Sequence, residues 1–154
     1  MSVCRRSRRI GDSADDSEMT GRGTGRPFRG RAPALPAMAL TSDSSVVTAI
    51  ANDYGYERVF ARQVEALGEE GDVALGISTS GRSENVEAAL AVARARGMVA
   101  IALTGRDVAR WAPMRISISM SPETSTARVQ EVHRTILHAM CQLIDRPALA
   151  DAEA

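Results

Sequence analysis

The sequence contains no lysine, only two cysteines and no excess of charge of either sign. Because 19 arginines balance 19 acidic residues, the bulk electrostatics indicate neither a nucleic-acid nor a membrane partner. Cys4 and Cys141 give neither a disulfide framework nor the CxxC spacing of a metal site. No apolar run is long enough to cross a membrane, and no signal-peptide core is present, so we predict a cytoplasmic location. The length of 154 residues suits one domain with a buried core.

The most informative stretch is residues 71–97, which predict a strand, a hydroxyl-rich turn and a helix in succession. Residues 73–77 are apolar and short enough for a buried strand. The turn then holds four hydroxyl residues and a glycine: Ser78, Thr79, Ser80, Gly81 and Ser83. Apolar residues at helical spacing follow, and Gly97 predicts the end of the helix.

Two interpretations of this turn stay open from the residues alone. The serines can be ordinary turn and N-cap residues. They can also bind a phosphate, because the first N–H groups of a helix are unpaired and its dipole favours an anion there. Serine hydroxyls would add donors without adding charge, and Gly81 would allow close approach of the backbone.

The pattern Ser78-Thr79-Ser80-Gly81-x-Ser83 after an apolar strand resembles the sugar-phosphate loop of sugar isomerase (SIS) domains. Three further stretches resemble the phosphoheptose isomerases, which interconvert sedoheptulose 7-phosphate and glycero-manno-heptose 7-phosphate. They are residues 18–22 (EMTGR), residues 51–56 (ANDYGY), and residues 130–133 (QEVH) followed by His138. The resemblance covers residues 18–145.

The resemblance implies an α/β, SIS-type (flavodoxin-like) fold of three layers, with a mostly parallel sheet flanked by helices. The alternation of strand and helix patterns predicts the same class. Strands are predicted at 37–41, 73–77, 98–103 and 115–119, and helices from Ser42 or Asp43 to 51, at 57–67, before Gly97, at 106–112 and at 126–145. Ligands in such sheets bind beyond the carboxyl ends of the strands, where Ser78 lies.

Residues 1–36 differ from the rest because they show no apolar period, and we predict an irregular segment there. We predict the SIS domain at 37–146 and a disordered tail at 147–154. Compared with the resembling family, the N-terminal helix and the first central strand are expected to be missing, with Val3 and Cys4 as only the tail of that strand. Loss of this strand is expected to split the sheet and leave two unpaired edges.

The pattern also predicts which side chains face inward. In helix 57–67 these are Val59, Phe60, Val64 and Leu67. In the last helix the apolar stripe is Val129, Val132, Ile136, Met140, Leu143 and Ile144, with Gln130, Arg134 and His138 on a separate face. Asn52 and Asp53 are predicted in a turn, and Trp111 as a packing anchor.

The resemblance implies a role for each candidate site residue. The phosphate is held by Ser78, Thr79, Ser80 and Ser83, while Asn52, Asp53 and Gln130 contact the rest of the substrate. Glu18, Gln130 and His138 hold a metal ion, usually zinc, together with a histidine whose position is occupied here by Ala14. Glu18 and His138 form the acid–base pair of a ketose–aldose isomerisation through an enediol.

The spacing of the last two ligands limits how the metal site is built. Gln130 and His138 are separated by about 12 Å along a helix that rises 1.5 Å per residue, and metal–ligand bonds are only about 2 Å long. Either the helix is irregular near Gln130, or neighbouring chains complete the site. We favour the composite site, and with it a homotetramer.

Two other function classes stay open. One is a non-catalytic SIS module that binds sugar phosphate, like a relative of these isomerases that associates with the bacterial replication initiator. The other is a non-functional fragment, which insoluble expression or failure to oligomerise would support. Turnover of sedoheptulose 7-phosphate distinguishes an enzyme, impaired or not, from both.

Overall fold

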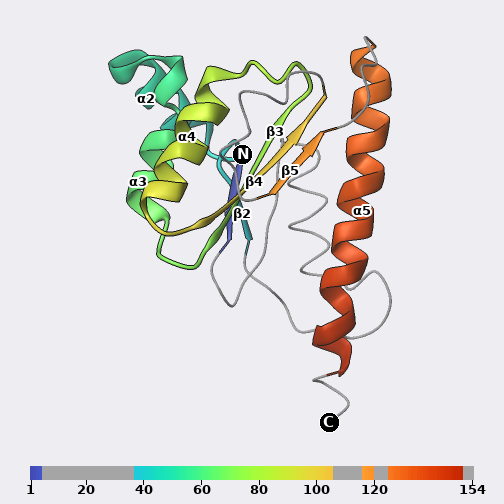
Figure 1. Cartoon of the computed structure of the whole chain (residues 1–154). Helices are drawn as coiled ribbons and strands as arrows, with labels where there is room; N and C mark the ends of the chain where they lie inside the picture. The colour runs from blue at the N-terminus through green and yellow to red at the C-terminus, as the bar shows by residue number, and fades with distance from the viewer. Residues whose placement is uncertain (5–36, 106–115, 120–124, 151–154) are drawn as a thin grey trace.

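A five-stranded sheet forms the middle layer of the computed structural model, which describes residues 1–4, 37–105, 116–119 and 125–150 (Figure 1). In the order β2-β1-β3-β4-β5, its strands are β2 (Ala37–Ala39), β1 (Ser2–Cys4), β3 (Val73–Ser78), β4 (Val99–Thr104) and β5 (Ile116–Ser119). The β3–β4 and β4–β5 pairs are parallel, whereas β1 is antiparallel to both β2 and β3. Four of the five strands therefore run in one direction, and the predicted α/β class with a mostly parallel sheet is confirmed.

The expectation of a sheet that lacks its first central strand needs correction, because β1 occupies an interior position. Ser2 pairs with Ala39 on one side and with Leu75 on the other. The backbone N–H of Leu40 also donates to the carbonyl of Met1 at 2.9 Å, and Met1 is buried. The sheet is therefore continuous from β2 to β5. Residues 2–4 are too few to show a period of two, so the sequence indicated Val3 and Cys4 only as the tail of a lost strand.

Three helices cover one face of the sheet (Figure 1). They are α2 (Ser44–Tyr54), α3 (Ala61–Leu67) and α4 (Glu84–Ala95), with the short 3-10 helix η1 (Tyr56–Arg58) between α2 and α3. Gly76 of β3 shows how closely α4 lies on the sheet. A Cβ atom there would be 2.5 Å from Val86 Cγ1 and 2.8 Å from Leu90 Cδ1. Small residues at this face, such as Ala74, Ala100 and Ala102, are fully buried under these helices.

The helix α5 (Thr126–Ala150) covers the opposite face, where Leu137 packs with Leu75, Ile101 and Leu103 (Figure 1). Among residues 126–144, for which burial is described, the buried residues are Val129, His133 and Leu137, spaced by four. The predicted stripe is thus correct for Val129, while Leu143, 62% exposed, was wrongly placed in it. Figure 1 shows that α5 runs past the end of the strands, so the sheet does not cover its whole length. The helix also continues to Ala150, into the tail predicted to be disordered.

The segment predicted as one helix at 57–67 consists of η1 and α3 instead. Val59, Phe60 and Val64 are buried as predicted, but Leu67 is 39% exposed because it lies in the last turn of α3. The predicted helix at 106–112, with Trp111, lies outside the described residues, as does Glu18. Among the helices that the structure describes, none is long and apolar enough to span a membrane.

The start of α2 offers a test of local stability. Asp43 is its N-cap, and the Asp43 carboxylate accepts a hydrogen bond from the N–H of Val46 at 3.0 Å. We expect Asp43→Ala to lower the free energy of unfolding by about 1 kcal/mol, because it removes the acceptor of a helix N–H. Asp43→Asn keeps an acceptor and is expected to lower it much less. Equal losses in the two variants, measured by urea denaturation, would show that the cap contributes nothing.

Candidate functional site

The serine-rich turn joins β3 to α4 at the carboxyl end of the sheet. The Ser78 and Ser83 hydroxyl oxygens are 2.8 Å apart, which makes them hydrogen-bond partners. The N–H of Gly81 donates to the carbonyl of Ser78 at 3.1 Å, and Gly81 has a φ of 69°, a conformation that glycine adopts without strain. The turn therefore holds the two hydroxyls together at the first turn of α4.

The N-cap interpretation of the serines holds only in part. Ser83 occupies the N-cap position of α4, but its hydroxyl makes no capping hydrogen bond. That hydroxyl bonds Ser78 instead, so it is not used to stabilise the helix end. Ser80 behaves as a turn residue, because its hydroxyl accepts a hydrogen bond from the N–H of Arg82 at 3.2 Å. The Ser78–Ser83 pair therefore stabilises neither the turn backbone nor the end of the helix, and capping does not account for it.

The end of β4 fixes the position of this turn. The N–H of Gly105 donates to the carbonyl of Ser78 at 3.3 Å. A Cβ atom on Gly105 would overlap the carbonyl oxygen of Thr79 and lie 2.6 Å from Val129 Cγ1. The turn, the end of β4 and the first turns of α5 are therefore in close contact. The sequence did not identify this contact.

An open pocket of about 500 Å³ lies beside the turn. It is lined by Tyr56 and Glu57 of η1 and by Ser83, Glu84 and Asn85 at the start of α4. Tyr56 and Glu57 follow the predicted Asn-Asp motif in the chain, but they were not among the predicted site residues. In the sequence, Tyr56 and Glu57 could not be distinguished from residues of an ordinary surface turn.

Asn52 and Asp53 lie in the last turn of α2 and not in the turn predicted for them. Gly55, with a φ of 90°, ends the helix after them, and its N–H donates to the carbonyl of Ala51. The Asn52 amide donates to the Asp53 carboxylate at 2.9 Å, and both residues are exposed. The structure thus places both polar groups just before η1, which lines the pocket.

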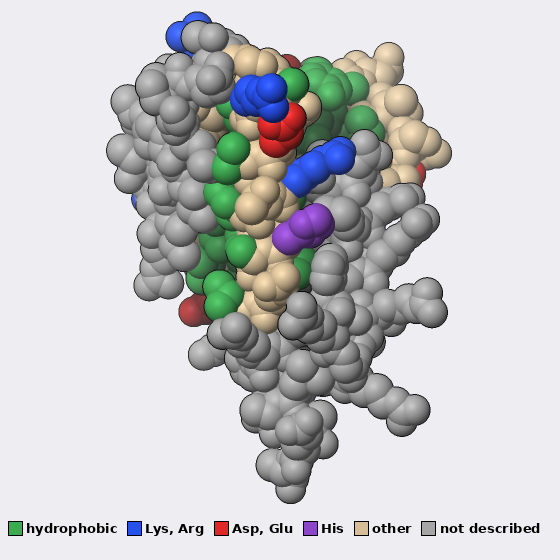
Figure 2. Space-filling model, turned by 90° about the vertical axis from the view of Figure 1, so that its right-hand side faces the viewer, with side chains coloured by type: hydrophobic (Ala, Val, Ile, Leu, Met, Phe, Trp, Pro, Cys, Tyr) green, Lys and Arg blue, Asp and Glu red, His purple; other side chains and the backbone are tan. Residues whose placement is uncertain are grey.

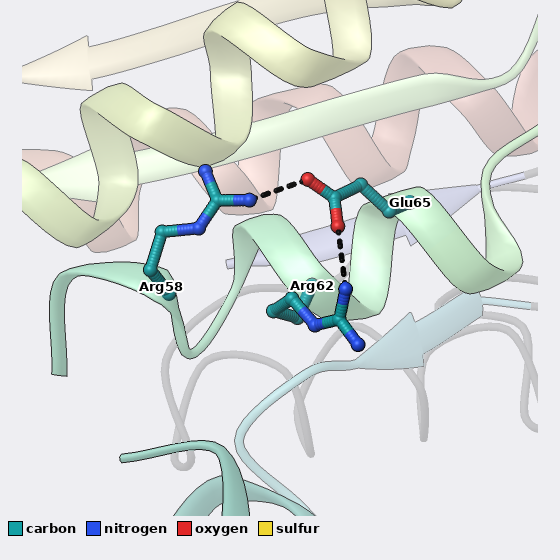
Figure 3. Close-up of polar contacts among 3 residues, drawn as sticks. All are labelled: Arg58, Arg62 and Glu65. Carbon is teal, nitrogen blue, oxygen red and sulfur yellow. Dashed lines mark hydrogen bonds and ion pairs between the residues drawn. The ribbon is translucent and has the colours of Figure 1, made fainter. Parts of the chain in front are cut away.

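Ion pairs fix the corner formed by η1 and α3 (Figure 3). The Glu65 carboxylate accepts from Arg58 at 2.6 Å and from Arg62 at 3.4 Å. The Arg62 guanidinium also lies 4.4 Å from the centre of the Tyr54 ring, at the end of α2. Each contact is partly exposed and contributes little free energy alone. Together they connect α2, η1 and α3, the elements that carry one wall of the pocket.

The predicted metal ligands of α5 lie on one side of that helix. Gln130 and Arg134 are exposed and His138 is half-buried, and Figure 2 shows basic, acidic and histidine side chains along this side of the molecule. Helix α5 is continuous from Thr126 to Ala150, which removes the alternative of an irregular helix near Gln130. Gln130 follows Val129, which contacts Gly105, so it lies near the serine turn, and His138 lies two turns farther along.

The complete metal-ligand set is not tested, because Glu18 lies outside the described residues. Within the described ranges, no group of three or more His, Cys, Asp and Glu side chains is arranged to hold a metal ion. An amide oxygen and an imidazole nitrogen are nonetheless donors that zinc accepts. The donor types of Gln130 and His138 therefore fit the predicted ion, and their separation favours ligands from more than one chain.

Comparisons with known proteins identify one family. Residues 11–105 match the family described as SIS domain. The phosphoheptose isomerase of Halorhodospira halophila is 47% identical over 139 residues, covering 88% of this chain and 70% of that protein. That of Alkalilimnicola ehrlichii is also 47% identical over 139 residues, with 88% and 71% covered.

Solved structures give the same result. A phosphoheptose isomerase from Francisella tularensis superposes with a TM-score of 0.79 at 36% identity, covering 88% of this chain and 74% of that one. The phosphoheptose isomerase structure from Neisseria gonorrhoeae gives a TM-score of 0.71 at 45% identity, with 84% and 71% covered.

Proposed function

This chain belongs to the phosphoheptose isomerase family of isomerases, and on that premise we propose that it interconverts sedoheptulose 7-phosphate and D-glycero-D-manno-heptose 7-phosphate. The substrate class is a phosphorylated sugar. The observation that carries the proposal is the Ser78–Ser83 hydroxyl pair at the first turn of α4. Its hydroxyls and the adjacent helix N–H groups are donors suited to a phosphate group.

The phosphate site supplies binding free energy and orientation at a distance from the reacting carbons. Thr79 and Ser80 extend the set of hydroxyls around the phosphate. Asn52, Asp53 and Gln130 are the candidates for contact with the sugar hydroxyls, since an amide or carboxylate oxygen accepts from a polyol. The pocket beside Ser83 gives the sugar a place between η1 and α4.

The reaction moves two protons and leaves the atom count unchanged. We assign Glu18 as the base that takes a proton from C1 of the ketose and returns it to C2 after the enediol has formed. His138 moves the hydroxyl proton from O1 to O2, because an imidazole has both a nitrogen that accepts a proton and one that donates it. The phosphate-binding hydroxyls hold the chain of the sugar in register while this happens.

Zinc is the proposed cofactor, held by Glu18, Gln130 and His138. When bound, the ion would stabilise the negative charge that develops on the substrate oxygen. Because Gln130 and His138 lie two turns apart on a continuous helix, we propose that neighbouring chains complete each site in a homotetramer. Activity then depends on assembly.

An isomerase assay with sedoheptulose 7-phosphate, with and without added zinc, tests this proposal. We expect zinc-dependent turnover, and about tenfold weaker substrate binding in Ser83→Ala because a hydrogen bond to a charged group is lost. Ser45→Ala, at an exposed position of α2, is the matched control and should bind normally. Absence of turnover, with sedoheptulose 7-phosphate still raising the Tm, would show a non-catalytic sugar-phosphate module instead.

A further inference from the structure

Thr104, the last residue of β4, carries a buried hydroxyl that the proposed site does not use. The residue has no exposed surface. Its Oγ1 atom has no hydrogen-bond partner in the part of the chain that the structure describes. A buried hydroxyl that makes no hydrogen bond destabilises the fold, because it has lost its hydration without compensation. This threonine is therefore unfavourable unless another state of the protein supplies a partner.

The sheet register places Thr104 beside Ser78. The two residues are Cα partners across β3 and β4, and paired residues of adjacent strands direct their side chains to the same face. That face is the one covered by α4, because Gly76, two residues before Ser78, faces Val86 and Leu90. The Ser78 hydroxyl accordingly reaches Ser83 at the N-cap of α4. Thr104 thus lies beside the start of the serine turn, on the strand adjacent to that of Ser78.

Counting protons shows what changes when an anion binds. Each hydroxyl has one proton to donate and two acceptor positions. In the Ser78–Ser83 pair, one hydroxyl donates to the other. Phosphate oxygens mainly accept, so both serines turn their protons towards a bound phosphate. The Ser78 oxygen is then released from its contact with Ser83, and Thr104, its Cα partner across the two strands, is a buried residue with an uncommitted hydroxyl proton.

We propose that Thr104 is a positioning residue of the phosphate site, whose hydroxyl donates to Ser78 Oγ when Ser78 donates to the phosphate. This inference rests on the proposed phosphate site at the serine turn. The result is a chain from Thr104 to Ser78 to the anion, in which each hydrogen bond polarises the next. Binding then gives the Thr104 hydroxyl the partner it otherwise lacks, so part of the cost of burying that hydroxyl is recovered in affinity for the phosphate.

Replacement of Thr104 by valine tests the chain, because valine keeps the branched shape and removes the hydroxyl. We expect Thr104→Val to raise the Tm of the ligand-free protein. We also expect it to raise the Kd for inorganic phosphate and for sedoheptulose 7-phosphate by about 3- to 10-fold, the equivalent of one hydrogen bond. If Thr104 had only a structural role, its loss would change the Tm and leave the Kd unchanged. A higher Tm together with a higher Kd therefore supports the role in binding.

A second pair of variants covers the case in which Thr104→Val misfolds. Thr104→Ser and Thr104→Ala both lose the methyl group and differ only in the hydroxyl, so Thr104→Ser should bind phosphate more tightly than Thr104→Ala. In a Ser78→Ala background, all Thr104 variants should have the same Kd, because Thr104 acts through Ser78.

The outcomes separate this inference from the proposed function. Normal phosphate affinity in both Thr104→Val and Thr104→Ala would overturn the role of Thr104 and leave the serine site standing. Failure of the unmodified protein to bind either phosphate or sedoheptulose 7-phosphate by calorimetry would overturn both.

Discussion

Replacing Gly105 by alanine is expected to weaken sugar-phosphate binding by about 10- to 100-fold, the loss of one hydrogen bond to a charged group. The new Cβ would overlap the backbone oxygen of Thr79 and lie 2.6 Å from Val129 Cγ1. A backbone carbonyl cannot move aside as a side chain can, so the serine turn must shift. The hydrogen bond from the Gly105 N–H to Ser78 would be strained by the same movement. Calorimetric titration with sedoheptulose 7-phosphate measures the effect.

Gly76→Ala is the matched control for Gly105→Ala. Its Cβ would meet the side-chain ends of Val86 and Leu90, inside the core and not at the turn. We expect this variant to lose about 1–3 kcal/mol of stability by overpacking, with the affinity of the folded fraction unchanged. If Gly105→Ala binds as tightly as the control, the close contact between the end of β4 and the turn has no part in binding.

Leu90→Ala is expected to cause the largest loss of stability, about 2–5 kcal/mol, because it removes a fully buried side chain and leaves a cavity. Leu90 lies in the middle of α4, has no exposed surface and faces the glycine of β3. Since whole domains are stable by only about 5–15 kcal/mol, a large share of the protein is then expected to unfold at 37 °C. Urea denaturation at constant pH measures the change.

Leu67→Ala provides the comparison for Leu90→Ala, since it is the same substitution in a neighbouring helix. Leu67 is 39% exposed at the end of α3, so little apolar area returns to water and no closed cavity forms. We expect a loss below about 1 kcal/mol. Equal losses in the two variants would contradict the burial of α4 against β3.

The central strand-turn-helix unit was predictable because each of its parts has a strong local signal. The apolar run of β3, the hydroxyls from Ser78 to Ser83 and the glycine at 97 each specify one element. The placement of Asn52 and Asp53 was not predictable in the same way. Their local preference for a turn does not interrupt the helix, which continues as far as the C-cap Gly55. Asn52 and Asp53 therefore form the last turn of α2.

Features that depend on distant parts of the chain were the ones that the sequence could not specify. Leu143 fits the apolar stripe of α5 by its spacing, and only the folded structure shows that it is exposed. Nothing in the local sequence marks Thr104, and only its register with Ser78 shows that it lies beside the serine turn. The metal ligands remain predictions because Glu18 lies outside the described residues.

The position of β1 also has a consequence for the order of folding. The β3–β4 and β4–β5 pairs join neighbouring strands of the chain, whereas Ser2 pairs with Leu75. Closing a loop of about 70 residues costs more chain entropy than closing the short βαβ crossovers. During synthesis, β1 leaves the ribosome first but has no β3 to pair with until much later. We therefore expect the β3-β4-β5 half to fold first and β1 and β2 to join it last, and we expect these two strands to exchange their amide hydrogens fastest.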